Sequence, residues 1–236
     1  MPASLSWRWV AVAVFAISST LNFLDRQILS ALAPQLRAEF GMTMAEYGLV
    51  ISAFSLSYFI ASPLMGLLID RIGLRAGASV AVAAWSLAGI ATGLTSTLRG
   101  LVTCRAALGM AEAGGIPGAG KSYAMYLKPE ERAIGAGLGQ AGLSVGVILA
   151  PVMAEALAGR YGWRAAFVVI GALGLLWIPL WLAVARKAPA VGDAPGTMSV
   201  PRGEMLRDRR YWALLTANIL LMSVYTLWMN WTTQFL

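Results

Sequence analysis

Long apolar stretches separated by short polar segments dominate the hydrophobic pattern of this chain. Five of these stretches contain no Asp, Glu, Lys or Arg: Tyr47 to Ile69, Ala76 to Leu98, Ala133 to Ala154, Ala165 to Ala185 and Tyr211 to Leu236. Two further stretches, Trp9 to Pro34 and Leu101 to Leu127, are as apolar but contain charged residues. A helix crosses a bilayer with about 20 apolar residues. The pattern therefore predicts an all-α membrane protein with seven candidate spans.

The polar segments between the stretches divide the chain into three parts. The spans are expected near residues 9–34, 45–69, 76–98, 100–127, 133–157, 163–185 and 211–236. The first six form a predicted six-helix transmembrane bundle over residues 1–185. Residues 186–210 hold three prolines and six basic side chains, which predicts a polar cytoplasmic linker. The seventh helix, residues 211–236, has no polar tail after it, so we expect it to begin a second, truncated half.

Composition and charge agree with a membrane protein and disfavour other classes. Hydrophobic residues make up 58% of the chain and charged residues 12%, about half the usual charged share of a soluble domain. With the N-terminus in the cytoplasm, eleven Lys and Arg side chains fall inside and four outside. This asymmetry follows the positive-inside rule, so the net charge of +7 reflects topology in a multi-pass inner (cell) membrane protein. We expect the chain to lie in a lipid bilayer and to bind no nucleic acid.

The residue types needed for metal or disulfide chemistry are scarce. The chain has no histidine, and Cys104 is its single cysteine. Histidine is the commonest metal ligand and general base, and one cysteine forms no internal disulfide. We therefore expect no metal, no cofactor and no enzymatic activity.

Four charged residues interrupt the two charged spans at a similar depth. Asp25 and Arg26 lie in the first span, and Arg105 and Glu112, seven residues apart, share one face of the fourth. A charge at the bilayer centre costs on the order of 3 kcal/mol. One interpretation is a pair of structural salt bridges. The other is a site in which the carboxyl groups carry protons and the guanidinium groups bind a carboxylate ligand.

Lys121 also lies in the fourth span but has a different setting. It is nine residues after Glu112, so on a straight helix it faces away from the Arg105–Glu112 face. Its long side chain is able to reach the cytoplasmic interface. The glycines and the proline between residues 114 and 120 offer a bend that would bring it toward a ligand instead. Both interpretations stay open.

Glycines recur along the fifth span. They are Gly135, Gly137, Gly139, Gly142 and Gly146. Small residues let helix backbones approach closely, so the pattern predicts tight helix packing, with sliding or bending as the alternative role.

A motif follows the second span. It consists of Gly66, Asp70, Arg71, Gly73 and Arg75. This spacing resembles the cytoplasmic signature of the major facilitator superfamily. An aspartate and arginines at helix ends can form a latch that breaks and reforms. The resemblance implies that these five residues are a cytoplasmic gating motif.

Within that superfamily, the chain is similar to the anion:cation symporter family of the hexuronate, or sugar-acid, type. The segments that carry the resemblance are residues 22–26 and 109–117, with Lys121 four residues after Pro117. The resemblance implies twelve helices in the whole transporter, of which this chain holds the N-terminal half and the seventh helix. It also implies substrate binding by Arg26, with Arg105 and Lys121 as further candidates.

The same resemblance implies proton coupling through Asp25 and Glu112, with Arg105 adjusting Glu112. The predicted function is proton-coupled symport of a small organic anion such as a hexuronate, an aldonate or another carboxylate. The alternatives are an antiporter or efflux carrier and a non-transporting truncated half. The expected partners are the organic anion, protons, and either a missing C-terminal half or a second copy of the chain.

Overall fold

The computed structural model describes residues 3–191 and 207–231 and divides into two compact units, Met1–Ala194 and Pro195–Leu236. All regular structure among the described residues is helical, which confirms the predicted fold class. Residues 192–206 form most of the predicted linker and lie outside the described residues, as do residues 232–236 of the predicted seventh span. In the second unit, the structure describes one long helix, α10 (Arg209–Trp231).

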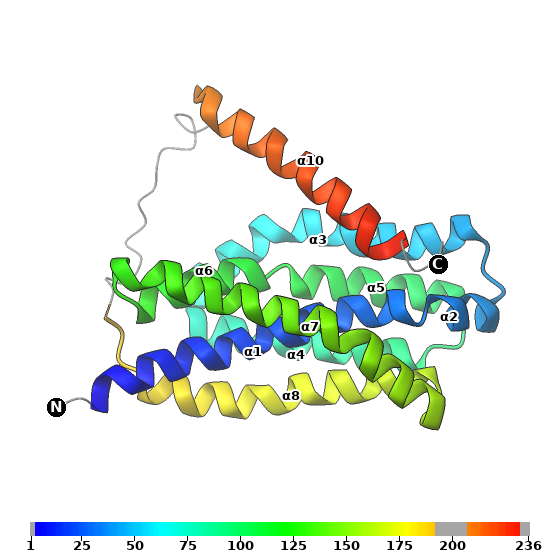
Figure 1. Cartoon of the computed structure of the whole chain (residues 1–236), viewed down its shortest axis with the longest axis horizontal. Helices are drawn as coiled ribbons and strands as arrows, with labels where there is room; N and C mark the ends of the chain where they lie inside the picture. Colours follow the sequence, from blue (N-terminus) through cyan, green and yellow to red (C-terminus); the bar gives the residue numbers. More distant parts are fainter. Residues whose placement is uncertain (1–2, 192–206, 232–236) are drawn as a thin grey trace. The chain divides into compact units, whose positions relative to one another are not determined.

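The first unit is a bundle of long helices that run side by side (Figure 1). These helices are α1 (Ala3–Ala31), α3 (Met44–Ile72), α4 (Leu74–Leu94), α7 (Arg132–Tyr161) and α8 (Trp163–Lys187). Within the described residues, these five elements are long and apolar enough to cross a membrane, and α10 is not among them. Five of the seven predicted spans therefore have direct counterparts.

The predicted fourth span is correct in position but is not one helix. It consists of α5 (Leu98–Glu112) and α6 (Gly115–Tyr126), separated by a turn at Ala113 and Gly114. Pro117 explains the break, because it has no N–H to donate to the carbonyl of Ala113 in a continuous helix. The 3-10 helix η1 (Pro129–Glu131) then leads into α7.

The first predicted span, near residues 9–34, is also interrupted. Helix α1 ends at Ala31, and a short helix, α2 (Ala33–Phe40), follows. Pro34 lies in the first turn of α2, where the absence of a backbone donor costs nothing. The charged pair Asp25–Arg26 nevertheless lies well within α1, as predicted.

Two tight connections between long helices depend on glycine. Gly73 joins α3 to α4 with φ +83°, and Gly162 joins α7 to α8 with φ +82°. Side chains with a Cβ atom rarely adopt such positive angles. Gly73 of the predicted gating motif therefore sets the sharp reversal between α3 and α4.

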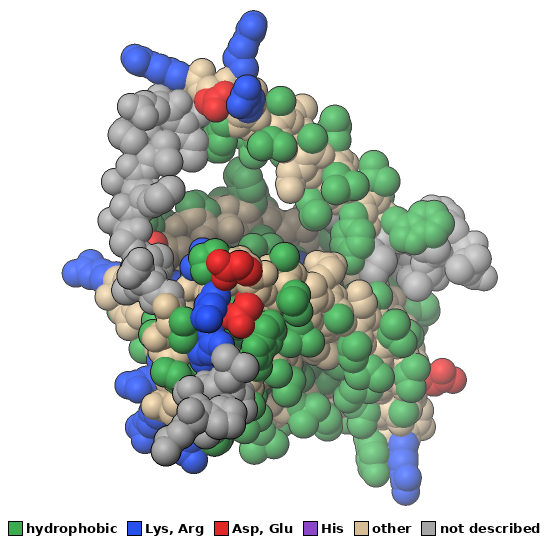
Figure 2. Space-filling view, turned by 60° about the vertical axis from the view of Figure 1, so that its left-hand side comes forward, with side chains coloured by type: hydrophobic (Ala, Val, Ile, Leu, Met, Phe, Trp, Pro, Cys, Tyr) green, Lys and Arg blue, Asp and Glu red, His purple; other side chains and the backbone are tan. Residues whose placement is uncertain are grey.

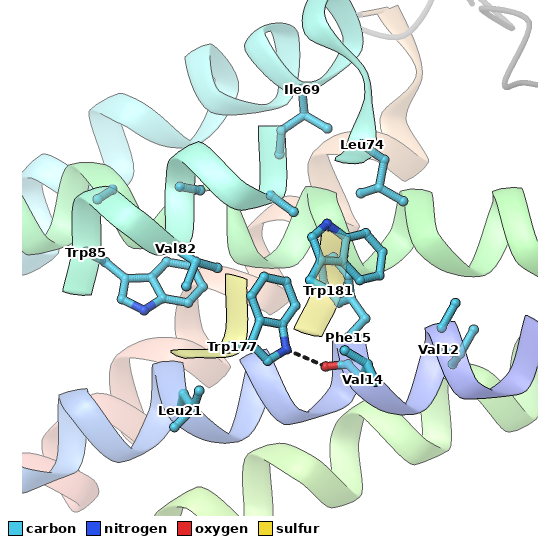
Figure 3. Close-up of a cluster of buried hydrophobic side chains, with 14 of the residues drawn as sticks. Val12, Val14, Phe15, Leu21, Ile69, Leu74, Val82, Trp85, Trp177 and Trp181 are labelled. Atoms are coloured by element: carbon cyan, nitrogen blue, oxygen red, sulfur yellow. Dashed lines mark hydrogen bonds between the residues drawn. The ribbon is translucent and has the colours of Figure 1, made fainter. Parts of the chain in front are cut away.

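An aromatic core holds α1, α4 and α8 together (Figure 3). Trp177 and Trp181, one turn apart on α8, stack with their ring centroids 5.4 Å apart, and Phe15 of α1 meets both edge-on. The indole N–H of Trp177 donates to the backbone carbonyl of Val14 at 2.7 Å. This bond satisfies a buried polar group and fixes the rotation of α1 against α8.

Glycines of α7 pack directly against the backbone of α1, which confirms the tight packing predicted for the fifth span. A Cβ atom at Gly142 would lie 2.7 Å from the carbonyl oxygen of Ala16, and one at Gly146 would meet the carbonyl oxygen of Thr20. Gly137 has no atom of another element within 4 Å of such a Cβ. The glycines therefore differ in role along one helix.

The outer faces of α3 and α7 are strongly apolar. Phe59 on α3 is 76% exposed and Ile148 on α7 is 67% exposed, and many aliphatic neighbours are exposed as well. Hydrophobic side chains cover the broad flank of the bundle, and most Lys and Arg side chains in view gather toward the end that comes forward (Figure 2). An exposed apolar surface this large marks contact with lipid or with another protein surface.

Candidate functional site

The bundle brings together the four charged residues predicted inside the spans. Asp25 and Arg26 come from α1, and Arg105 and Glu112 come from α5. The side chains of Asp25, Arg105 and Glu112 are at most 3% exposed, and Arg26 is half-buried. Two acidic and two basic groups balance in charge, which lowers the cost of their burial. We call these four residues the buried quartet.

The shortest contact in the buried quartet joins α1 to α5. The Nε–H of Arg26 donates to Glu112 Oε2 at 2.8 Å. The other carboxylate oxygen of Glu112, Oε1, is buried without a hydrogen-bond partner. The sequence placed Arg105 and Glu112 on one face of a helix but did not indicate that Arg26 would be the partner of Glu112.

The carboxylate of Asp25 on α1 lies beside Gly89 of α4. A Cβ atom at Gly89 would lie 3.2 Å from Asp25 Oδ1, so glycine at this position lets α4 approach the carboxylate closely. Oδ1 is buried without a hydrogen-bond partner. The neighbouring Asn22 also has a buried amide nitrogen without a partner. This part of the site therefore has both a free acceptor and a free donor.

Aromatic rings surround the Arg26 guanidinium, and most of them were not foreseen from the sequence. Its Cζ atom lies 4.9 Å from the ring centroid of Phe23, 5.0 Å from that of Phe54 and 4.7 Å from that of Tyr58. Phe54 and Tyr58 are four residues apart on α3, so they share a helix face. That spacing was the signal available in the sequence.

Arg105 carries two further donors that the site leaves free. Its Nε and one terminal nitrogen, Nη1, are buried without a hydrogen-bond partner. Its Cζ atom lies 5.0 Å from the ring centroid of Phe54. A guanidinium with free donors is suited to binding a carboxylate, and free carboxyl oxygens beside it are suited to holding a proton.

Lys121 lies apart from the buried quartet, at the end of the bundle where α3 terminates. Its Nζ donates to Asp70 Oδ1 at 2.6 Å and to the carbonyl oxygen of Ile69 at 3.1 Å. The Asp70 side chain is 60% exposed, whereas that of Lys121 is 13% exposed. Asp70 of the predicted gating motif and Lys121 thus form an ion pair, and we call this place the Asp70 end.

The other residues of the predicted gating motif lie near Asp70 in the sequence, on α3, on α4 and at the turn between them. Arg71 is at the last turn of α3 and Arg75 is in the first turn of α4, and both are exposed. Gly66 lies on α3 beside Pro117 of α6. Among the described residues, no group of three or more His, Cys, Asp or Glu side chains is placed to hold a metal ion.

Comparison with known proteins gives one family and a consistent set of relatives. The family model described as Major Facilitator Superfamily matches residues 15–236. The chain is 32% identical to a galacturonate transporter of Dickeya chrysanthemi over 74% of its own length and 51% of that protein. It is 26% identical to a hexuronate transporter of Escherichia coli (strain K12) over 97% of its length and 57% of that protein. The chain therefore spans about half the length of these relatives.

The fold also matches a solved structure. It resembles the inward-facing, unoccupied crystal structure of a bacterial homolog to the human lysosomal transporter Spinster. The TM-score is 0.84 with 23% sequence identity, over 97% of this chain and 55% of that one. At this identity, the similarity establishes the arrangement of the helices alone.

Proposed function

Because this chain belongs to the Major Facilitator Superfamily, we propose that it forms part of a proton-coupled symporter for a small organic anion. A hexuronate is the proposed substrate type, and an aldonate or another carboxylate has the same recognition chemistry. The relatives named as galacturonate and hexuronate transporters support this proposal. The proposed location is the inner (cell) membrane, with the N-terminus in the cytoplasm.

The observation that carries the proposal is the set of free hydrogen-bonding atoms in the buried quartet. Arg105 has two buried donors without partners, and Asp25 and Glu112 each have one such acceptor oxygen. If the quartet were only a pair of structural salt bridges, these donors and acceptors would hydrogen-bond to one another. We assign Arg26 and Arg105 to the anion's carboxylate, and Asp25 and Glu112 to the protons.

The pairing of Arg26 with Glu112 suggests how the two ligands are linked. When Glu112 takes up a proton, its carboxyl group no longer holds the Arg26 guanidinium by charge, and Arg26 is released to bind the anion. Bound anion and bound proton together restore a neutral site, which is cheaper to keep in the membrane than an unbalanced one. This exchange is our proposed basis for symport.

The Asp70 end is the proposed gate. Lys121 is held by Asp70 through an ion pair whose carboxylate is exposed, so the pair contributes little stability and opens at low cost. We propose that this pair opens as the carrier releases the anion to the cytoplasm. Lys121 is then free to contact the departing carboxylate.

A complete transport path needs a second bundle. Halves of this superfamily are related by an axis along the membrane normal, and the site lies between them. The exposed apolar faces of α3 and α7 are the proposed contact surfaces for that second bundle or for lipid. The second bundle is either further sequence of the same polypeptide or a second copy of this chain.

Uptake of labelled D-galacturonate into proteoliposomes that contain the native gene product tests the proposal. We expect Arg26→Ala to abolish uptake and Arg26→Lys to retain a small part of it, since lysine keeps the charge but loses the two-pronged donor geometry. Arg99→Ala is the matched control, because Arg99 is an exposed arginine away from the quartet. Undiminished uptake by Arg26→Ala would refute the ligand assignment.

A further inference from the structure

One aromatic ring contacts both guanidinium groups of the buried quartet. Phe54 of α3 lies with its ring centroid 5.0 Å from the Cζ atom of Arg26 and 5.0 Å from that of Arg105. The two arginines come from different helices, α1 and α5. Both distances lie within the range of favourable cation–π attraction. The ring of Phe54 is therefore the shared neighbour of the two cations.

The position of Phe54 is fixed by the contact between α3 and α5. A Cβ atom at Gly109 of α5 would meet the carbonyl oxygen of Phe54, so the two backbones touch at this residue. The hydroxyl of Ser57 donates to the same carbonyl at 2.9 Å, and the Tyr58 ring stacks on Phe54 at 5.9 Å. The side chain itself is 9% exposed. The ring thus has little freedom to move.

Arg105 depends on this ring more than a hydrogen-bonded arginine would. Its Nε and Nη1 donors have no hydrogen-bond partner, so the charges of Glu112 and Asp25 attract the guanidinium but no hydrogen bond from these atoms fixes its orientation. Two like charges in a buried site also repel each other. The negative face of an aromatic ring attracts both charges, whereas an aliphatic side chain of similar size fills the space without this attraction.

We propose that Phe54 is a positioning residue that holds Arg26 and Arg105 together in the geometry that a carboxylate requires. The ring fixes both guanidinium groups before the anion arrives, so binding the anion costs less side-chain conformational entropy. Its effect falls mainly on affinity for the anion, because it touches the ligand-binding groups and lies away from the Asp70 end. This inference rests on the proposed function of the quartet.

The test compares Phe54→Leu and Phe54→Met with Phe54→Tyr in the native gene product. Binding of D-galacturonate is measured by calorimetry, and transport gives the KM and the turnover rate. For Phe54→Leu and Phe54→Met we expect Kd and KM to rise about tenfold, because each variant loses two cation–π contacts. The turnover rate should change less than about twofold. Phe54→Tyr keeps the ring and should bind within about threefold of the unaltered protein.

Phe167→Leu is the matched control for removing a buried ring. Phe167 is fully buried on α8 and its ring packs on Trp163. We expect this variant to lower thermal stability without raising the Kd. Equal binding by Phe54→Leu and Phe54→Tyr, or an equal rise in the Kd with Phe167→Leu, would overturn the role of the ring. Failure of the unaltered protein to bind any sugar acid would instead overturn the proposed function, and this inference with it.

Discussion

Three of the four charged side chains of the buried quartet keep a buried polar atom without a hydrogen-bond partner. Asp25 and Glu112 each have a buried oxygen without a partner, and Arg105 has two such nitrogens. A buried polar group left without a hydrogen bond costs about 1–3 kcal/mol. Under the proposed function, a substrate carboxylate or a proton offsets this cost during the transport cycle. The four residues thus combine one strong ion pair with several groups available to a ligand or a proton.

Glu112→Gln tests the proton role at the residue scale. Glutamine keeps a hydrogen-bonding group beside Arg26 but neither gains nor loses a proton, so coupled uptake should fall by about tenfold or more. Exchange of labelled D-galacturonate across the membrane at equal pH needs no net proton movement and should persist. Both are measured in proteoliposomes.

The control for Glu112→Gln is Glu39→Gln. Glu39 pairs with Arg164 at 2.9 Å, but its side chain is 45% exposed and it lies on α2, away from the quartet. This variant should leave both coupled uptake and exchange unchanged. Equal loss of uptake and exchange in Glu112→Gln would argue for a structural salt bridge instead.

The sequence predicted the members of the quartet but not their pairing. The charges stood out because each interrupts a long apolar stretch, and the seven-residue spacing placed Arg105 and Glu112 on one face. The partner of Glu112 depends on how α1 is rotated within the bundle, and contacts such as the bond from Trp177 of α8 to Val14 fix that rotation. Phe54 was missed for the same reason: its spacing from Tyr58 showed that the two rings share a face of α3, but not that this face lies against Arg26 and Arg105.

At the scale of helices, glycine decides how closely α7 approaches α1. Gly142 and Gly146 lie against backbone carbonyls of α1, and any side chain there would force the helices apart. Gly137, on the same helix, faces open space. Close packing without side chains is a common way for helices to associate in membranes. The position of α1, and so of Asp25 and Arg26, depends on this contact.

Gly142→Ala and Gly137→Ala form a matched pair of substitutions on α7. Overpacking at Gly142 should destabilise the bundle by about 1–3 kcal/mol, because the added methyl group meets the carbonyl oxygen of Ala16. Gly137→Ala should be neutral or slightly stabilising, since alanine favours a helix more than glycine does. Thermal unfolding in detergent measures both. Equal stability of the two variants would contradict the packing described here.

Lys121 lies on α6, after the break between α5 and α6, and pairs with Asp70 of α3. On a straight helix Lys121 would lie on the opposite face from Glu112. The turn at Ala113 and Gly114 changes the direction in which the side chains of α6 point relative to those of α5. The sequence indicated this bend through its glycines and Pro117. It did not indicate that Asp70 would be the partner of Lys121, which requires the relative position of α3 and α6.

Lys121→Met tests whether this ion pair belongs to the transport cycle. An ion pair with an exposed partner contributes about 0–1 kcal/mol, so the free energy of unfolding should change little. If the pair opens and closes as a gate, turnover of D-galacturonate should fall by about fivefold or more. Arg99→Met is the control for removing an exposed cation. Unchanged turnover in Lys121→Met would refute both roles proposed for Lys121, in the gate and in contacting the departing carboxylate.

At the scale of the whole molecule, the first unit is a compact helical bundle that contains the buried quartet and exposes the apolar faces of α3 and α7. The relatives are about twice as long as the stretch that this chain matches. The lengths of the apolar stretches predicted the bundle, because bilayer thickness sets the length of a membrane-spanning helix. The interruptions by α2 and the α5–α6 turn were harder to predict, since apolar content continues through them and only single prolines and glycines mark them.

The assembly that transports should contain two six-helix bundles. We expect native mass spectrometry of the active gene product, extracted from its own membrane, to give roughly twice the 25.0 kDa of this chain. A single polypeptide of that mass identifies a second half in the same protein. Two copies of a 25.0 kDa chain identify a homodimer. Full transport by a 25.0 kDa monomer would contradict the need for a second bundle.

Proton movement driven by an organic anion tests the central claim most directly. The native gene product is reconstituted into vesicles that trap a pH-sensitive dye, at equal pH on both sides, and an inward gradient of D-galacturonate is imposed. Symport predicts that the vesicle interior acidifies as protons enter with the anion, and that Arg26→Ala and protein-free vesicles show no such change. An interior that becomes alkaline, or anion entry without any change in pH, would contradict proton-coupled symport.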